Sequence, residues 1–299
     1  MRVLISGATG LVGSTLYLTL HKQGHDVVRL VRSMSDKSGN DLIWDPATGA
    51  TETSRFEGFD AVVHLAGESI SSGRWTKQKK ERIRASRVTG TQNLAKILAG
   101  LQKPPQVFVS ASAIGYYGNR GEETLDEQSQ PGTGFLSDVC KEWEAATAAA
   151  ASKGIRTVQL RSGIILSPQG GALKMMLVPF KLGVGGILGN GKQYMSWIVL
   201  EDALGVIIKA IADPHLSGPV NVVAPEPVTN QVFTSTLGDI LSRPTLLPLP
   251  SFAARLAFGE MADALLLASA RVAPKKLQAA GYSFNYPNLA GALKGLLPR

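Results

Sequence analysis

Three glycines near the start of the chain have the spacing of a phosphate-binding turn. Gly7, Gly10 and Gly13 form the pattern G-x-x-G-x-x-G, a variant of the dinucleotide fingerprint. There the first glycine permits a tight turn, the second lets the backbone approach a pyrophosphate, and the third lets helix and strand pack closely. The helix that follows would direct unpaired N–H groups at the phosphates. The spacing therefore predicts a dinucleotide site.

A basic side chain stands where such a site distinguishes between its two nicotinamide cofactors. NAD sites place an acid at the end of the second strand for the ribose 2′-hydroxyl, whereas an arginine there accommodates a 2′-phosphate. The segment 27–33 contains no acid and ends with Arg32 next to Ser33. A planar guanidinium can hold a phosphate through two parallel hydrogen bonds. Arg32 therefore favours NADP, the alternative being an ordinary surface arginine.

Positive charge is concentrated in one segment. The chain has a net charge of +8, and the stretch from Arg74 to Arg87 contains seven lysines and arginines against one acid. A nucleic-acid-binding protein usually carries a broad basic face with interleaved aromatics, and here only Trp75 is interleaved. A phosphate-bearing small ligand or a solvated helix face fits better. Arg82 and Arg87 are five residues apart, so we expect them to point in different directions along a helix.

The elements that must position these residues follow an alternating pattern. Continuous β-branched runs that alternate with helices indicate parallel strands covered on both faces, joined by right-handed crossovers. The predicted fold class is α/β, with a doubly wound parallel sheet of the Rossmann type. We expect strands at 2–6, 27–31, 60–65, 106–110, 157–160, 194–199 and 220–223, and helices after the glycine turn and at 77–101, 136–151 and 201–212.

The second part of the chain differs in composition from the first. A glycine-rich stretch covers 167–191, and prolines interrupt the shorter elements from residue 225 on. We expect an NAD(P)-binding Rossmann domain at 1–225, with 166–195 contributing to the substrate side. A smaller C-terminal α/β domain on the substrate side would occupy 226–299.

Composition excludes several classes of protein. The single cysteine, Cys140, rules out an internal disulfide framework and cysteine-rich zinc modules. The four histidines, at positions 21, 25, 64 and 215, are not grouped in a metal-ligand pattern, so no metal site is expected. No apolar run approaches the ~18 residues that a membrane span needs. The sequence predicts a cytoplasmic protein with a small-molecule substrate, no nucleic-acid or membrane partner, and a homodimer as its one candidate assembly.

Further motifs extend over nearly the whole chain. With the glycine turn, the strand ends His64–Gly67 and Ser110–Ser112 resemble those of the extended short-chain dehydrogenase/reductase superfamily. A narrower resemblance, to an uncharacterised epimerase family whose C-terminal part is a domain of unknown function, rests on several other stretches. These include Ser112–Gly118 (SAIGYYG), Val139–Glu144 (VCKEWE), Ser196–Ile198 (SWI) and Gly259–Met261 (GEM).

The resemblance implies a set of cofactor-binding residues. The cofactor would lie along the glycine turn and the ends of the second and third strands, with Arg82 or Arg87 on the basic helix facing it. The basic segment would then counter phosphate charge in a partly dry cleft. The residues assigned in this way are Gly7, Thr9, Gly10, Leu11, Val12, Gly13, Arg32, Leu65, Ala66, Gly67, Arg82 and Arg87.

The catalytic residues of the wider superfamily are only partly present. There a Ser orients the substrate oxygen, a Tyr is the general acid/base, and a Lys four residues later lowers the Tyr pKa. Ser112 fits the first role and Lys141 the third, but Ser137 stands at the Tyr position. A serine hydroxyl is shorter and much less acidic than a phenol of pKa ~10. The usual proton relay is therefore absent.

Three explanations remain open at this point. Tyr116 or Tyr117 supplies the phenol; Glu68 or another group handles the proton; or catalysis is lost. The leading hypothesis is an NADP-dependent oxidoreductase or nucleotide-sugar-epimerase-like enzyme of unknown substrate that moves a hydride at a carbonyl or alcohol carbon. The alternative is a non-catalytic NADP(H)-binding redox sensor or interaction module.

Overall fold

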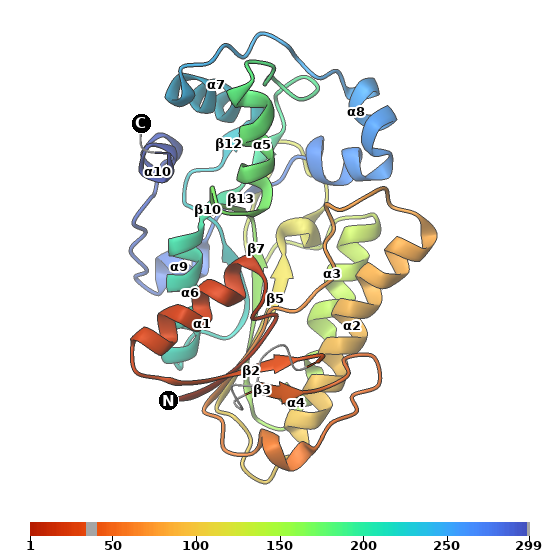
Figure 1. Ribbon diagram of the computed structural model, residues 1–299, viewed down its shortest axis with the longest axis vertical. Coiled ribbons are helices and arrows are strands. Elements are labelled where there is room, and N and C mark those ends of the chain that lie inside the picture. The colour runs from red at the N-terminus through yellow and green to blue at the C-terminus, as the bar shows by residue number, and fades with distance from the viewer. Residues whose placement is uncertain (34–40, 298–299) are drawn as a thin grey trace.

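A seven-stranded sheet forms the centre of the molecule. A computed structural model describes residues 1–33 and 41–297 (Figure 1). The strand order is β11-β7-β5-β4-β1-β2-β3, and all neighbouring strands are parallel. The chain moves outward from β1 first to one side and then to the other, which confirms the doubly wound fold. The strands are β1 Arg2–Ser6, β2 Asp26–Val31, β3 Asp41–Ile43, β4 Ala61–His64, β5 Val107–Ala113, β7 Arg156–Ser162 and β11 Gly218–Val222.

Helices cover both faces because alternate residues of each strand point to opposite sides. Val3 and Ile5 belong to the apolar core on the side of α1 and α6, whereas Leu4 belongs to the core under α2 and α4. In the described residues, no helix is both long enough and apolar enough to cross a membrane. The helices beside the sheet are α1 Leu11–Lys22, α2 Lys77–Ala99, α3 Phe135–Ala145, α4 Ala148–Ser152 and α6 Leu200–Ala212.

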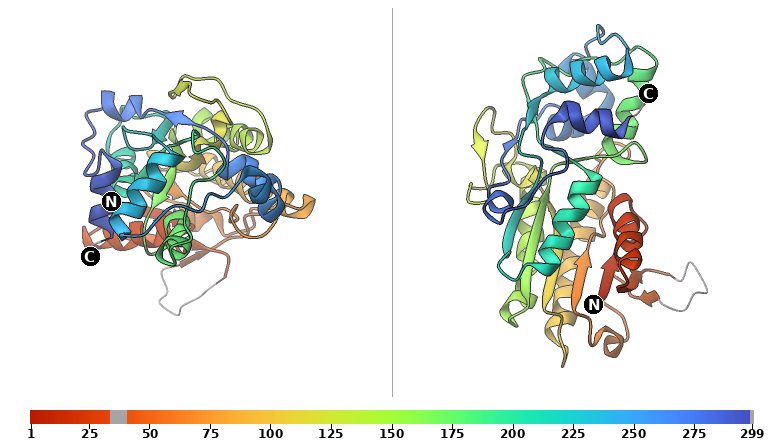
Figure 2. Two further views of the ribbon diagram at one scale, coloured as in Figure 1. Left: turned by 90° about the horizontal axis from the view of Figure 1, so that it is seen from above. Right: turned by 90° about the vertical axis from the view of Figure 1, so that its left-hand side faces the viewer.

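Smaller elements gather at one end of the long axis, beyond the carboxyl ends of the strands (Figures 1 and 2). Three two-stranded sheets lie outside the main sheet, among the residues that the structure describes: β8–β10, β9–β12 and β6–β13. Because β6 pairs with β13, segments far apart in the sequence interlock here. Their bounds are β6 Thr124–Leu125, β8 Ile164–Leu166, β9 Tyr194–Met195, β10 Trp197–Val199, β12 Val228–Thr229 and β13 Arg271–Val272.

The remaining helices and short turns lie in this smaller region or in the connections between strands of the main sheet. They are α5 Gly171–Lys181, α7 Asn230–Leu241, α8 Ser251–Phe258, α9 Lys275–Ala279 and α10 Leu289–Leu296, with the short turns η1 Thr53–Phe56, η2 Ile114–Tyr117 and η3 Ala262–Leu266.

Two elements expected to be continuous are each divided in the structure. The single helix expected at 136–151 is interrupted between α3 and α4. The single strand expected at 194–199 is two short strands separated by Ser196. The Ser196 hydroxyl donates to the Ala270 carbonyl at 2.7 Å and accepts from the Val272 N–H at 2.9 Å. Between the two short strands, Ser196 is thus bonded to the segment 270–272, which includes β13.

Candidate functional site

Two glycines of the turn between β1 and α1, Gly7 and Gly13, pack against backbone with no room for a Cβ. A Cβ on Gly7, whose φ is +72°, would lie 2.7 Å from the backbone nitrogen of Ala66. A Cβ on Gly13 would lie 2.2 Å from the Gly7 carbonyl oxygen. At Gly10 a Cβ would meet only the Gly7 carbonyl, at 3.4 Å. This close packing is what the fingerprint requires, so the turn fits the pyrophosphate of a dinucleotide.

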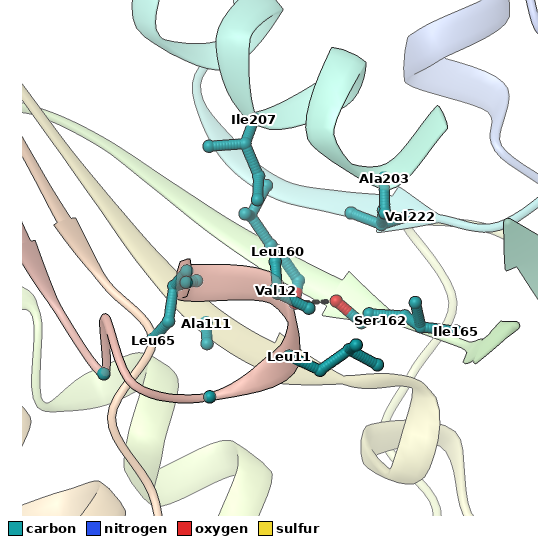
Figure 3. Close-up of a pocket in the computed structure, with 13 residues that line it drawn as sticks. Leu11, Val12, Leu65, Ala111, Leu160, Ser162, Ile165, Ala203, Ile207 and Val222 are labelled. Atoms are coloured by element: carbon teal, nitrogen blue, oxygen red, sulfur yellow. Dashed lines mark hydrogen bonds between the residues drawn. The ribbon is translucent and has the colours of Figure 1, made fainter. Parts of the chain in front are cut away.

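A mostly apolar cavity of about 230 Å³ opens beside this turn (Figure 3). It extends from the glycine turn past the ends of β5 and β7 toward α6. Among its lining residues Ser162 supplies a polar side chain, and that hydroxyl donates to the Leu160 carbonyl at 3.5 Å. The cavity suits an apolar ring better than a charged group. It is lined by Gly7, Gly10, Leu11, Val12, Gly13, Leu65, Ala111, Leu160, Ser162, Ile165, Ala203, Ile207 and Val222.

Arg32 follows β2 directly and its side chain is exposed. The strand before it pairs with β1 in parallel, with Leu30 opposite Ser6, so Arg32 lies on the same sheet edge as the glycine turn. The neighbouring Ser33 is exposed as well. This placement leaves the guanidinium accessible to a ligand at that edge.

The basic helix makes ion pairs with acids from other parts of the chain. Four of its cations lie near carboxylates, and two of them, Arg82 and Arg84, are about half exposed. These pairs join α2 to the loop after β4, to the end of α8 and to α3. They are Lys79–Glu68 at 2.7 Å, Arg82–Glu68 at 3.7 Å, Lys80–Glu260 at 2.9 Å and Arg84–Glu142 at 3.4 Å.

Glu68 is a poor proton donor in this arrangement. The hydrogen bond from the Lys79 ammonium is the main cause that lowers the pKa of the Glu68 carboxyl, and Arg82 adds to it. Arg87 also reaches Glu68, donating from Nη1 to its main-chain oxygen at 3.0 Å. Arg82 and Arg87 thus meet different parts of Glu68: the half-exposed Arg82 lies near its carboxylate, and Arg87 binds its carbonyl.

The Ser112 hydroxyl, near the end of β5, is hydrogen-bonded to a residue of α3. It donates to Oε1 of Glu144 at 2.7 Å, and the residue is 4% exposed. The same carboxylate receives two hydrogen bonds from Arg161, both at 2.8 Å. Because side chains alternate along β5, Ser112 faces α3 while Ala111 lines the cavity. This geometry gives Ser112 a role in holding Glu144 and no contact with the cavity.

The two tyrosines after β5 differ in their surroundings. The Tyr117 hydroxyl lies 2.7 Å from Oδ1 of Asn221 and accepts from Nη1 of Arg161 at 3.0 Å. Burial raises the pKa of Tyr117 to about 12. Tyr116 is only half-buried, and its ring lies 3.5 Å from the Arg161 guanidinium carbon. Tyr117 is thus buried and hydrogen-bonded, whereas Tyr116 is the more exposed of the two tyrosines.

The expected Lys and Tyr positions on α3 differ in their surroundings: Lys141 faces solvent, whereas Ser137 is buried against the turn that follows β5. Lys141 is exposed and lies 2.7 Å from Oδ1 of Asp138. The Ser137 hydroxyl is 2.8 Å from the Tyr116 carbonyl. The α3 face that meets Gly115 carries Leu136 and Cys140 instead.

Direct contacts define that face. A Cβ on Gly115 would lie 3.4 Å from Cβ of Leu136 and 3.7 Å from Sγ of Cys140. Burial raises the pKa of Cys140 to about 12, so its thiol stays protonated. Cys140 is thus a buried packing residue, and the spacing of four residues fixed a helix face but not the neighbour that it meets.

His64, at the end of β4, is fully buried, and only one of its two ring nitrogens has a hydrogen-bond partner in the described chain. Its Nδ1 lies 2.5 Å from the Ser6 hydroxyl, whereas Nε2 has no hydrogen-bond partner within the described chain. Burial lowers the pKa of His64 from 6.5 to about 4. The imidazole is therefore neutral in the folded protein at neutral pH.

This difference in pKa predicts an acid-sensitive contribution to stability. Between pH 6.5 and about 4 the unfolded chain gains a proton at His64 that the folded chain does not. The contribution of His64 to the free energy of unfolding is fully present above pH 6.5. It decreases by about 3 kcal/mol in total as the pH is lowered to about 4. Urea unfolding of the wild type and His64→Gln from pH 7 to 4 measures the difference. An exposed-site variant, His21→Gln, is expected to keep the wild-type slope; equal slopes for all three proteins would contradict the prediction.

Comparisons with known proteins extend over the whole chain. Residues 3–223 match the NAD dependent epimerase/dehydratase family, and residues 249–296 match a domain of unknown function, DUF1731. Epimerase family protein Mb2239 of Mycobacterium bovis is 44% identical over 291 residues, which cover 97% of this chain and 96% of the relative.

Two solved structures give the same result at the level of the fold. Human epimerase family protein SDR39U1, crystallised with NADPH, has a TM-score of 0.91 at 35% identity and covers 99% of both chains. A nucleoside-diphosphate sugar epimerase from Corynebacterium glutamicum has a TM-score of 0.81 at 36% identity, over 98% of this chain and 57% of that one.

Proposed function

The chain belongs to the NAD dependent epimerase/dehydratase family, and on that premise we propose that it is an NADP(H)-dependent oxidoreductase acting at a carbonyl or alcohol carbon. One observation carries the proposal: the glycine turn excludes any Cβ at Gly7 and Gly13 and borders an apolar cavity at the carboxyl edge of the sheet. The human relative crystallised with NADPH supports the choice of cofactor.

Each part of the cofactor has a matching group in this chain. The N–H groups at the start of α1 face the position of a pyrophosphate, and Arg32 offers a guanidinium for the 2′-phosphate. The backbone of Leu65 and Ala66 borders the turn from the β4 side. The cavity beyond it would hold the nicotinamide ring. Bound NADPH would supply a hydride, and these residues orient it.

We assign the proton transfer to Tyr116. The resemblance pointed to Ser112 and Lys141, and Tyr117 was the other tyrosine considered, but each of these is held by another residue: Glu144, Asp138 and Asn221 respectively. Tyr116 carries the remaining phenol at the end of β5, and the Arg161 guanidinium fixes the face of its ring. Ser112 then acts indirectly, because it helps to hold the Glu144 carboxylate that holds Arg161.

The same contacts favour a second candidate function, NADP(H) binding without turnover. In a redox sensor the catalytic hydroxyls and the lysine would be free to take structural roles, as Ser112, Tyr117 and Lys141 do here. Both functions require the same cofactor site, so only turnover separates them.

The deciding experiment measures binding and turnover on one preparation. Fluorescence titration with NADPH and NADP⁺ establishes binding, and loss of NADPH absorbance with a carbonyl panel establishes turnover. We expect tight NADPH binding and slow oxidation with at least one carbonyl, lost in Tyr116→Phe and kept in Tyr117→Phe. Binding of both redox forms with no turnover would favour the sensor, and no binding of either would overturn both functions.

Cofactor choice gives a separate prediction. Removing the guanidinium in Arg32→Ala deletes one charge-assisted contact to the 2′-phosphate, which at an exposed site corresponds to roughly a tenfold loss of NADPH affinity. NADH affinity is expected to stay unchanged. Parallel titrations with NADPH and NADH measure the ratio; an equal loss for both cofactors would show that Arg32 does not read the phosphate.

A further inference from the structure

Two segments carry most of the exposed apolar side chains. Of the large apolar side chains that are exposed in the described residues, eight lie within 175–184 and 246–256, and four lie elsewhere. Leu246 is 82% exposed and Phe252 is 72% exposed. On α8, Phe252 and Leu256 are four residues apart and share one face of the helix, whereas Ala254 is buried on the other. Such a concentration of apolar surface is typical of a contact with a partner outside the chain.

The two segments lie side by side at one end of the molecule. Gly186 and Leu246 form an antiparallel bridge, and the Leu249 N–H donates to the Ile187 carbonyl at 2.8 Å. The connection from α7 to α8 crosses the end of the long axis at which α5 also lies (Figure 1). The exposed side chains of both segments therefore belong to one end of the molecule. We call this set the distal apolar surface; it consists of Leu182, Val184, Leu246, Leu247, Phe252 and Leu256.

The charges in these segments all have the same sign. Residues 171–192 and 242–258 contain three lysines, two arginines, and no aspartate or glutamate. Arg255 is paired with Asp263 at 2.9 Å. The other four cations are exposed, and in the described part of the chain no carboxylate lies within 4.0 Å of their side-chain nitrogens. They are Lys174, Lys181, Lys192 and Arg243. The distal apolar surface is thus bordered by positive charge, which complements an anionic partner.

The charge and the residue types distinguish between kinds of partner. In a two-fold symmetric dimer the same patch meets itself, so a second copy would bring these cations close to one another. Leu and Val are under-represented among the residues that carry the binding energy between proteins, whereas Trp and Tyr are enriched. The distal apolar surface contains four leucines, one valine and one phenylalanine. Leu and Phe beside Lys and Arg are typical of a surface that lies on a bilayer.

We propose that the distal apolar surface binds a bilayer containing anionic lipids. Its apolar side chains would enter the boundary between headgroups and acyl chains, and its cations would lie at the headgroups. The sequence predicted no membrane partner because no apolar run is long enough to span a bilayer, but a protein that lies on the surface needs no such span. This role goes beyond the proposed function and does not depend on it.

Co-sedimentation of the full chain with vesicles tests the proposal. One vesicle is phosphatidylcholine alone, and in the other about a third of the lipid is phosphatidylglycerol, which is anionic. We expect roughly tenfold tighter binding to the anionic vesicle, because it attracts the exposed cations. Added salt should weaken this binding by screening the attraction.

Matched variants locate the contact. Replacing both Leu246→Ser and Leu247→Ser should weaken binding to the anionic vesicle roughly tenfold or more, because two exposed leucines no longer leave water. Leu18→Ser, at a side chain on α1 that is 55% exposed, should have no effect.

A second pair of variants tests the charges. Lys174→Glu with Lys181→Glu should weaken the binding at low salt. Lys103→Glu with Lys153→Glu changes the net charge equally, at exposed lysines that precede β5 and β7 at the opposite end of the sheet. This control pair should bind nearly as the wild type does.

Each outcome supports or overturns the membrane contact. Thermal unfolding and NADPH titration establish that every variant is folded. Absence of binding to both vesicles, or equal binding to both, overturns the proposal. Binding that is unchanged in the folded double-serine variant, or lost equally in the control variants, also overturns it. A dimer in sedimentation velocity that the double-serine variant dissociates would assign the surface to a second copy. Because none of these measurements requires turnover, failure of the membrane contact leaves the proposed oxidoreductase function intact.

Discussion

Gly13→Ala is expected to abolish NADPH binding at concentrations where the wild type is saturated. The new Cβ would lie 2.2 Å from the Gly7 carbonyl oxygen and 2.8 Å from the Gly7 carbonyl carbon. Both atoms are backbone, so no side chain can rotate away. Either the turn or the start of α1 must shift, and both carry the groups that face the pyrophosphate. We expect at least a hundredfold loss of NADPH affinity, together with a stability loss of about 1–3 kcal/mol from overpacking.

The matched control is the same substitution at a glycine with space. Gly100 ends α2 with φ −88°, and a Cβ there would meet only carbonyl oxygens at 3.5 and 3.6 Å, which is ordinary contact. Gly100→Ala should leave both NADPH affinity and thermal unfolding close to wild type. Fluorescence titration and thermal denaturation of both variants provide the comparison. Near-normal NADPH binding by Gly13→Ala would show that the turn is not the cofactor cradle.

The glycine turn could be predicted from the sequence because its requirements are local. Gly7 needs a positive φ and Gly13 needs the absence of a Cβ, and both needs arise within a few residues of one strand end. The parallel sheet could also be predicted, because continuous β-branched runs alternate with helical segments along the sequence. The limits of the elements were less predictable: β5 continues to Ala113, beyond the expected end at residue 110, where small residues carry no strong strand signal.

The orientation of Ser112 and Lys141 could not be predicted, because it depends on which neighbour each face meets. The sequence places both at the expected spacing, yet Ser112 faces α3 and Lys141 faces solvent. The partners of the basic helix were hidden for a similar reason. Glu142 and Glu260 lie far from α2 in the sequence, and only the fold brings them to it.

Glu144→Ala is expected to destabilise the fold severely. Arg161 is 3% exposed, and its guanidinium makes two hydrogen bonds of 2.8 Å to the Glu144 carboxylate. Removing that carboxylate leaves a buried cation without a counter-ion, and it also leaves Ser112 without its acceptor. Breaking one side of a buried pair costs about 3–5 kcal/mol. That is a large share of the roughly 5–15 kcal/mol by which folded proteins are stable.

A glutamate two residues away on the same helix provides the control. Glu142 pairs with Arg84 at 3.4 Å, but their side chains are 43% and 48% exposed. Such an exposed pair contributes at most about 1 kcal/mol, so Glu142→Ala should unfold at nearly the wild-type urea concentration. Urea denaturation of both variants at neutral pH measures the contrast. Both substitutions remove one carboxylate from α3, so the expected difference in stability comes from burial alone. Equal losses of unfolding free energy in the two variants would mean that Arg161 is stabilised chiefly by Tyr117 and the Tyr116 ring.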